Sequence, residues 1–224
     1  AEAIHPGFGF LSENSRFAAM CEECNIVFIG PKSETIDAMG NKINARRLMI
    51  EAEVPVIPGS KGAISDVEEA LTIAEEIGYP VMLKAAAGGG GKGIRKVADK
   101  EALPHHFASA QQEAKAAFGN DEMYIEKIIY PARHIEVQVL GDSFGNIIHL
   151  GERDCSLQRN NQKVLEESPS VVISESKRAE LGEAAVRAAQ AVGYRNAGTI
   201  EFLMADTGEF YFMEMNTRIQ VEHP

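Results

Sequence analysis

The sequence predicts a mixed α/β protein that becomes richer in β-structure toward its C-terminus. Strand-like and helical segments alternate at first, a glycine loop then separates two short strands, and long strands joined by turns follow from Arg133. An apolar content of 45% and a charged content of 25% over 224 residues are typical of a globular protein. A chain of this length can bury a sizeable core, in one domain or two small ones.

The elements follow in a clear order. We expect a strand at 1–4, a helix at 13–24, a strand at 26–29 and helices within 33–53, as in the last units of an α/β layer. Pro55, Pro58 and Gly59 mark a linker. A second unit then has a helix at 66–77, strands at 80–84 and 94–97, a helix at 100–118 and a strand at 123–128. Long strands, a helix at 175–191 and a hairpin at 199–216 complete the pattern.

Composition excludes several classes of protein. The net charge of −11 argues against a nucleic-acid surface, and no apolar run reaches the roughly 18 residues that a membrane span needs. Three cysteines indicate a reducing compartment, the cytoplasm or an organelle matrix. Cys21 and Cys24 have the spacing of a thiolate pair, but packing within a helix is the favoured interpretation. The chain starts without Met and stops within a polar motif, so we expect a piece cut at both ends.

A run of glycines, Gly88 to Gly91, precedes Lys92 between two expected strands. Such a loop lets backbone N–H groups approach phosphate oxygens. It is not a Walker A loop, because Gly93 stands where Ser or Thr is required. A flexible hairpin tip is the alternative. Lys84 favours phosphate binding, because an unpaired ammonium at the end of a buried strand would be costly.

The hairpin at 199–216 predicts a metal site. A two-residue turn at Thr207-Gly208 places Glu201 opposite Glu214 and Thr199 opposite Asn216. In this register the side chains of Phe210, Phe212, Glu214 and Asn216 share one face. Facing carboxylates are destabilising unless a cation lies between them, and Mg²⁺ or Mn²⁺ prefers oxygen ligands. The alternative is an exposed acidic pair in a register shifted by one residue.

Two further segments are dense in polar residues. Residues 133–138 alternate polar with apolar side chains, and residues 151–159 follow on the next strand. His134 alone is more often a structural histidine than a ligand. These strands by themselves indicate no reaction.

Five motifs together resemble the biotin carboxylase family of ATP-grasp ligases, and the resemblance spans the whole chain. They are residues 5–14, Lys84 with its glycine loop, and residues 133–138, 152–156 and 214–224. Within the family, the sequence looks most like the biotin carboxylase subunit of bacterial acetyl-CoA carboxylase, an enzyme of fatty acid biosynthesis. The pyruvate and propionyl-CoA carboxylases share the motifs.

The resemblance implies an ATP-grasp fold truncated at both ends. Residues 1–55 would be the last part of the N-terminal domain and its connection, 56–128 the lid, and 129–224 part of the central catalytic subdomain. Lysines and glycines would bind the ATP phosphates. Residues at the hinge of the lid would contact adenine, and a histidine would contact the ribose. The implied ATP-binding residues are Lys42, Lys84, Gly88, Gly89, Gly90, Gly91, Glu126, Lys127, Ile129, His134 and Gln158.

The resemblance also implies the chemistry. Glu201, Glu214 and Asn216 would carry Mg²⁺ or Mn²⁺, with two ions expected. Bicarbonate, activated by ATP as carboxyphosphate, would carboxylate biotin on a carrier protein, with Glu222 as base and Arg218 stabilising the biotin enolate. The implied bicarbonate and biotin residues are Lys163, Arg218, Gln220, Val221 and Glu222. The implied partners are the biotin carboxyl carrier protein, a carboxyltransferase and a second copy in a homodimer.

Three positions depart from the family pattern. Asn160 removes a charge that normally lies near the phosphates, Pro131 comes one residue early, and Phe8 replaces a usual tyrosine. Two other functions stay open. One is another ATP-grasp ligase, of the carbamoyl-phosphate synthetase type, and the other is a nucleotide-binding module without turnover.

Overall fold

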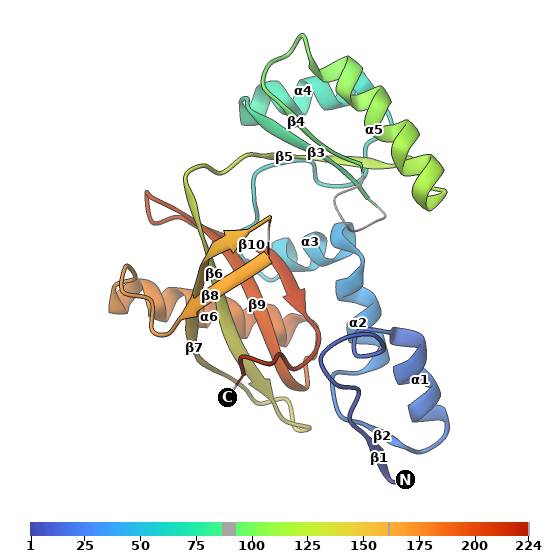
Figure 1. Cartoon of the computed structure of the whole chain (residues 1–224), viewed down its shortest axis with the longest axis vertical. Helices are drawn as coiled ribbons and strands as arrows, with labels where there is room; N and C mark the ends of the chain where they lie inside the picture. The colour runs from blue at the N-terminus through green and yellow to red at the C-terminus, as the bar shows by residue number, and fades with distance from the viewer. Residues whose placement is uncertain (87–92, 161, 224) are drawn as a thin grey trace. The chain divides into compact units, whose positions relative to one another are not determined.

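The computed structural model describes residues 1–86, 93–160 and 162–223 (Figure 1). The chain divides into two compact units. The first comprises Ala1–Gly40, Asn44–Val56 and Pro131–Pro224, and the second comprises Asn41–Ile43 and Ile57–Tyr130. No helix in these described ranges is both long and apolar enough to be a candidate membrane span.

A five-stranded antiparallel sheet forms the centre of the first unit. Its strand order is β10-β9-β6-β7-β8. The strands are β6 (Ala132–Gly141), β7 (Ile147–Arg159), β8 (Gln162–Glu167), β9 (Asn196–Ala205) and β10 (Phe210–Asn216). These are the long strands joined by turns that the sequence predicts.

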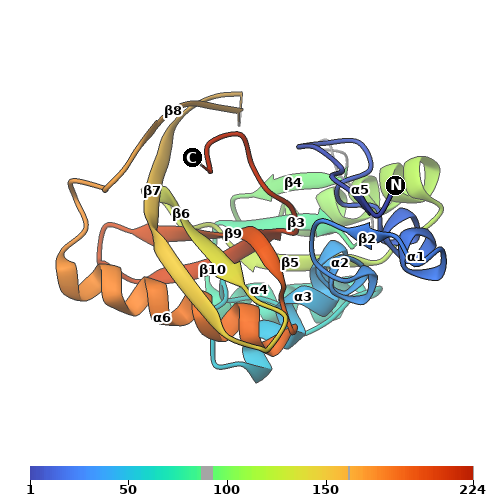
Figure 2. The same cartoon turned by 90° about the horizontal axis from the view of Figure 1, so that it is seen from below.

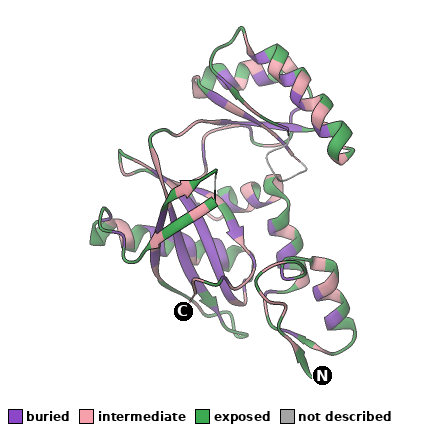
Figure 3. Ribbon diagram, viewed as in Figure 1, coloured by how far each residue is buried: buried purple, intermediate pink, exposed green. Residues whose placement is uncertain are grey.

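Helix α6 (Glu175–Ala191) covers one face of this sheet, and the segment after β10 lies on the opposite side (Figure 2). The helix starts at Ser174, whose hydroxyl accepts a hydrogen bond from the Lys177 backbone N–H. The apolar residues of β6 and β9 pack against it, and buried residues accordingly run along these two strands (Figure 3). Because side chains alternate along a strand, His134, Glu136 and Gln138 lie on the other face of the sheet.

The N-terminal part of the first unit is a small α/β layer. Strands β1 (Ala3–Ile4) and β2 (Val27–Phe28) are parallel. Helix α1 (Ser15–Glu23) joins the two strands, and α2 (Ser33–Gly40) and α3 (Lys42–Glu51) follow them; the first two residues of α3 belong to the second unit. Cys21 is buried in the core of this layer while Cys24 is exposed, and both thiols are free. Cys21 therefore packs within the helix, as expected.

The second unit is a three-stranded antiparallel sheet with two helices. The strand order is β4 (Ile94–Val97), β3 (Val81–Ala85) and β5 (Met123–Lys127). Helices α4 (Val67–Ile77) and α5 (Leu103–Phe118) supply Ala70, Ala74 and Ala110 to its core. Helix α5 starts three residues later than the sequence predicts, with a proline in its first turn, and ends at Gly119 in the left-handed conformation.

Candidate active site

The β9–β10 hairpin places Glu214 directly opposite Glu201 and Asn216 opposite Thr199. This is the pairing that the sequence predicts, but the predicted two-residue turn is wrong. The N–H of Ala205 donates to the carbonyl of Glu209 (2.8 Å), so three residues form the loop, with Gly208 at φ +87°. Phe210 consequently pairs with Met204, one position away from the predicted register.

A β-bulge between Phe212 and Glu214 restores the predicted pairing. The extra residue, Met213, also changes which side chains share a face. Phe212 packs in the core beneath the sheet, whereas Glu214 faces the opposite side. The prediction that the two phenylalanines share a face with Glu214 and Asn216 is therefore wrong, because it assumed an unbroken alternation.

Four charged residues lie side by side across four strands. Arg153 on β7 is opposite Glu136 on β6, Glu136 is opposite Glu201 on β9, and Glu201 is opposite Glu214 on β10. Adjacent carboxylates repel one another unless cations compensate them. Arg153 donates to Glu136, and Lys163 from β8 bonds to both Glu136 and Glu201. The row is thus held together by two cations, one from β7 and one from β8.

Glu201 is buried and accepts three hydrogen bonds. They come from His134 Nε2 (2.6 Å), Asn216 Nδ2 (2.7 Å) and Lys163 Nζ (3.0 Å). Burial alone would raise the pKa of Glu201, but the bond from His134 and the charge of Lys163 outweigh it and lower that pKa to about 2. Glu201 is therefore a carboxylate at neutral pH.

Lys163 is the cation that lies between the carboxylates. Burial would lower its pKa, but Glu201 and Glu136 raise it above the ordinary value, so the ammonium stays charged. His134 is positioned by Gln158, whose Nε2 lies 2.7 Å from His134 Nδ1. With this amide as donor, the ring proton is on Nε2 and is shared with Glu201.

These side chains line a pocket of about 750 Å³ on the face of the sheet that α6 does not cover. We call it the polar pocket. Most of the sequence-predicted site residues of the first unit line it: His134, Gln158, Lys163, Glu201, Glu214, Asn216, Arg218, Gln220 and Glu222. Val221 is 71% exposed and is not among the lining residues. The polar pocket thus contains oxygen atoms that can bind a cation and positively charged groups that can bind an anion.

Gln220 supplies an uncompensated acceptor to the polar pocket. The residue is 4% exposed, and its Oε1 has no hydrogen-bond donor within the described part of the chain. A buried carbonyl oxygen without a donor costs free energy, so such atoms normally have a protein, water or ligand partner. The pocket is therefore suited to a ligand that carries a hydrogen-bond donor.

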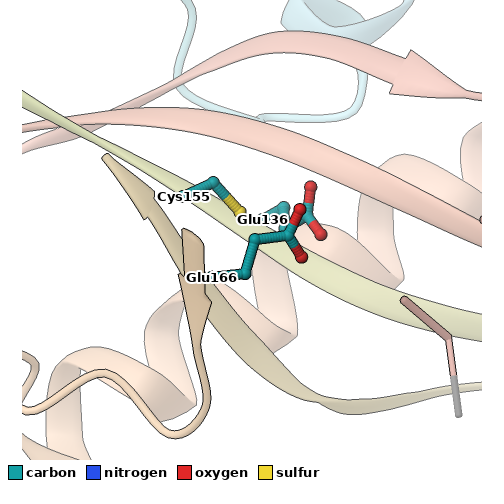
Figure 4. A group of neighbouring side chains, drawn as sticks. All are labelled: Glu136, Cys155 and Glu166. Carbon is teal, nitrogen blue, oxygen red and sulfur yellow. The ribbon is translucent and has the colours of Figure 1, made fainter. Parts of the chain in front are cut away.

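Glu136, Cys155 and Glu166 form a cluster that sequence reasoning missed as a group (Figure 4). A carboxylate oxygen from each glutamate and the Cys155 sulfur lie within 4.8 Å of one another. Burial and the neighbouring Glu136 raise the pKa of the Cys155 thiol, and they also raise that of Glu166. Because Arg153 and Lys163 already neutralise Glu136, we assign no metal to this cluster.

Two family models together match almost the whole chain. One is described as "Biotin carboxylase, N-terminal domain" and matches residues 1–36; the other is "Carbamoyl-phosphate synthase L chain, ATP binding domain" and matches residues 41–224. Biotin carboxylase 1 of Bacillus subtilis is 58% identical over 225 residues, which is 100% of this chain and 50% of that protein. This chain belongs to the biotin carboxylase family.

Other relatives in the biotin carboxylase family are almost as similar to this chain. The 2-oxoglutarate carboxylase small subunit of Hydrogenobacter thermophilus is 54% identical across 100% of this chain and 48% of that protein. The crystal structure of a biotin carboxylase–ATP complex from Campylobacter jejuni matches with a TM-score of 0.92 and 56% identity, covering 100% of this chain and 50% of that one. The chain spans about half the length of the curated relatives it matches. Over this half, the chain has the ATP-grasp fold of biotin carboxylases.

The second unit carries most of the expected ATP-binding residues of the family. Lys84 Nζ bonds to Glu126 Oε2 (2.5 Å) on the neighbouring strand and lies 5.6 Å from the centre of the Tyr124 ring. Lys84 is therefore not the unpaired ammonium that the sequence suggests, because Glu126 already compensates its charge; its contact with ATP stays a prediction. Lys127 Nζ donates to the carbonyl of Ile77 (2.7 Å) at the end of α4.

Within the described ranges, the remaining expected ATP-binding residues of the second unit make no contact that indicates their role. Lys42 is exposed at the first residue of α3, and Ile129 is half-buried just after β5. Gly88, Gly89, Gly90 and Gly91 lie outside the described residues. Asn160 has φ +53° in the turn between β7 and β8, where asparagine is one of the few residues that adopt such a conformation easily.

Sequence reasoning missed Arg153, Glu136 and Glu13 as parts of the site. The alternation of residues 133–138 places Glu136 on the same face as His134, so its position could have been inferred. Glu136 is buried beside Arg153 of β7 and Lys163 of β8, and the sequence does not specify the register of these two strands. Glu13 lies 204 residues before its partner Thr217, and no local pattern predicts that contact.

Proposed function

We propose that the protein to which this chain belongs carboxylates biotin with ATP and bicarbonate. A bicarbonate oxygen attacks the γ-phosphorus of ATP, ADP leaves, and the bicarbonate proton passes to a base. Carboxyphosphate then breaks down to CO₂ and phosphate. A ureido nitrogen of biotin gives its proton to the released phosphate and bonds to the CO₂ carbon, which makes the enzyme a ligase that forms a C–N bond.

The observation that carries this proposal is the content of the polar pocket. Arg218 offers guanidinium donors to a small anion, Lys163 adds an ammonium that also bonds to Glu136 and Glu201, and Gln220 offers a buried acceptor without a donor. Bicarbonate fits both requirements, because it carries a negative charge and one O–H group. An anion without a proton, such as chloride, would leave Gln220 Oε1 without a partner.

The expected metal ligands also fit their role. Glu201, Glu214 and Asn216 offer carboxylate and amide oxygens, which Mg²⁺ and Mn²⁺ prefer, and all three line the polar pocket. Asn216 donates through Nδ2 to Glu201, which leaves its amide oxygen available for an ion. When bound there, a divalent ion would neutralise charge on the ATP phosphates.

Glu222 and Arg218 would take different parts in the reaction. Glu222 lines the polar pocket and can accept the bicarbonate proton as a carboxylate. A guanidinium has hydrogen-bond donors and no acceptor, so Arg218 can hold the anion and stabilise an oxyanion that develops on biotin, but it cannot act as the base. For ATP, the candidates remain Lys42, Lys84, Glu126, Lys127, Ile129, His134, Gln158 and the Gly88–Gly91 loop.

Substitutions in the full-length enzyme test these roles. Glu222→Gln should abolish both biotin carboxylation and bicarbonate-dependent ATP cleavage. Arg218→Ala should lower carboxylation by about 10²–10³-fold while some bicarbonate-dependent ATP cleavage remains. Glu180→Gln, at an exposed position on α6, is the matched control and should have no effect. Near-normal carboxylation by Glu222→Gln would refute the assigned base.

The description of one matching family model favours a second candidate, an ATP-grasp ligase of the carbamoyl-phosphate synthetase type. Such an enzyme would share the metal ligands and a carboxyphosphate intermediate. It would use no biotin. ATP cleavage that responds to ammonia but not to biotin would favour this second candidate.

We further propose that the carboxyl acceptor is acetyl-CoA, reached through a biotin carboxyl carrier protein and a carboxyltransferase, and that the parent protein is a homodimer. A relative named for 2-oxoglutarate is almost as similar as those named biotin carboxylase, so the acceptor needs its own test. Radiolabelled bicarbonate supplied with the native carrier and transferase would identify it. Label in malonyl-CoA supports acetyl-CoA, and label in a dicarboxylic or tricarboxylic keto acid contradicts it.

A further inference from the structure

Glu13 connects the start of the chain to the polar pocket. Its Oε1 accepts hydrogen bonds from the Thr217 backbone N–H (3.0 Å) and the Thr217 hydroxyl (3.3 Å). Its Oε2 accepts one from Arg218 Nε (3.3 Å). One carboxylate thus contacts the backbone, a hydroxyl and the guanidinium of two consecutive residues that follow β10.

The position of Glu13 is fixed by its neighbours. Asn14 caps α1 by accepting a hydrogen bond from the Phe17 N–H (2.8 Å), and its own N–H donates to the Leu11 carbonyl (3.2 Å). Ser12, on the other side, is 1% exposed, and its N–H donates to the Gly9 carbonyl (3.1 Å). The backbone of Glu13 therefore lies in a constrained turn, and its carboxylate is placed by the contacts with Thr217 and Arg218.

Arg218 receives its orientation from two acceptors. Besides Nε on Glu13, its Nη1 donates to the carbonyl of Ile219 (3.3 Å). A guanidinium has five N–H donors in a rigid plane, so these two contacts set the plane and leave other donors for an anion in the polar pocket. Thr217 is buried and held by the same carboxylate, so the backbone that carries Arg218 is fixed as well.

We propose that Glu13 is a positioning residue that holds Arg218 at the angle needed to bind the anionic substrate. This inference rests on the proposed function of the polar pocket. Glu13 does not line that pocket, so it would act through Arg218 rather than on substrate. The pair is partly exposed, with the Glu13 side chain at 43% and that of Arg218 at 21%, so a role in orientation is favoured over one in stability.

The test uses the full-length enzyme and Glu13→Gln. The amide oxygen can still accept from Thr217, while the charged partner of Arg218 is lost. We expect biotin carboxylation to fall about 10–10²-fold, with the KM for ATP and the thermal unfolding temperature unchanged. Glu13→Asp, which keeps the charge on a shorter side chain, should recover part of the loss.

A matched control is available in the same N-terminal layer. Glu22 also accepts a backbone N–H (3.2 Å) and a hydroxyl (3.0 Å) from a single residue, Ser33, but it lies outside the polar pocket. Glu22→Gln should leave carboxylation unchanged. An equal loss in both variants would mean that Glu13 acts only as a structural contact, and would overturn the proposal.

A double-mutant cycle separates this inference from the proposed function. If Glu13 acts through Arg218, combining Glu13→Gln with Arg218→Ala should be no worse than Arg218→Ala alone. Additive losses, or full activity of Glu13→Gln beside an impaired Arg218→Ala, would overturn the positioning role. Full activity of Arg218→Ala would instead refute the proposed role of Arg218. A Glu13→Gln protein that fails to fold, with an equally unstable Glu13→Asp, would assign Glu13 to stability and overturn the inference.

Discussion

Glu201 gathers contacts from three strands, because His134, Lys163 and Asn216 come from β6, β8 and β10. The same oxygens that we propose as metal ligands are thus compensated by protein groups. This arrangement keeps a buried carboxylate ionised, which a hard cation requires. It also predicts how stability depends on pH.

The pKa of Glu201 is about 2 in the folded protein against an ordinary value of 4.5. A group with a lowered folded pKa stabilises the native state above its unfolded pKa and loses that contribution as the pH falls toward the folded pKa. The difference in free energy of unfolding between wild type and Glu201→Gln should therefore shrink from about pH 5 to about pH 3. Urea denaturation at both pH values measures it, and a constant difference would contradict the assigned contacts.

Arg153 tests the charged row across the sheet. Its side chain is 11% exposed, and it donates to Glu136, which is fully buried. Arg153→Met leaves that carboxylate with Lys163 alone and should lower the free energy of unfolding by about 3 kcal/mol or more. Arg47→Met removes an exposed pair with Glu51 and should cost less than about 1 kcal/mol. Chemical denaturation measures both free energies of unfolding. If the two substitutions lower them by similar amounts, Arg153 does not compensate a buried charge.

At the scale of elements, the sequence predicts type and order better than detailed geometry. In the hairpin, the sequence predicts the Glu201–Glu214 pair correctly, although the turn that it predicts is one residue too short. The bulge at Met213 compensates for the longer turn, and no local signal in the sequence marks it. Contacts across long separations, such as Glu13 with Thr217, depend on tertiary packing and could not be predicted.

Deletion of Met213 tests the role of the bulge. Removing this residue should give a regular strand in which Glu214 still faces Glu201 and Phe212 stays in the core. Deletion of Tyr211 instead should move Phe212 to the polar face and lose its contacts with the core. Thermal unfolding should show a small loss for the first deletion and a large one for the second. The opposite ranking would contradict the described register.

At the scale of the whole molecule, the first unit holds the polar pocket and the second holds most of the expected ATP-binding residues. The family resemblance inferred from the motifs is confirmed by the comparisons. The proposed reaction begins when a bicarbonate oxygen in the polar pocket attacks ATP.

Bicarbonate labelled with heavy oxygen shows which oxygen attacks ATP. The attacking oxygen becomes the bridge between carbon and phosphorus, and it stays with phosphorus when carboxyphosphate breaks down. The full-length enzyme, turning over ATP with biotin, should therefore release inorganic phosphate that carries label from bicarbonate, as measured by mass spectrometry. Phosphate labelled only from solvent water would mean that water attacks ATP, and would contradict the account.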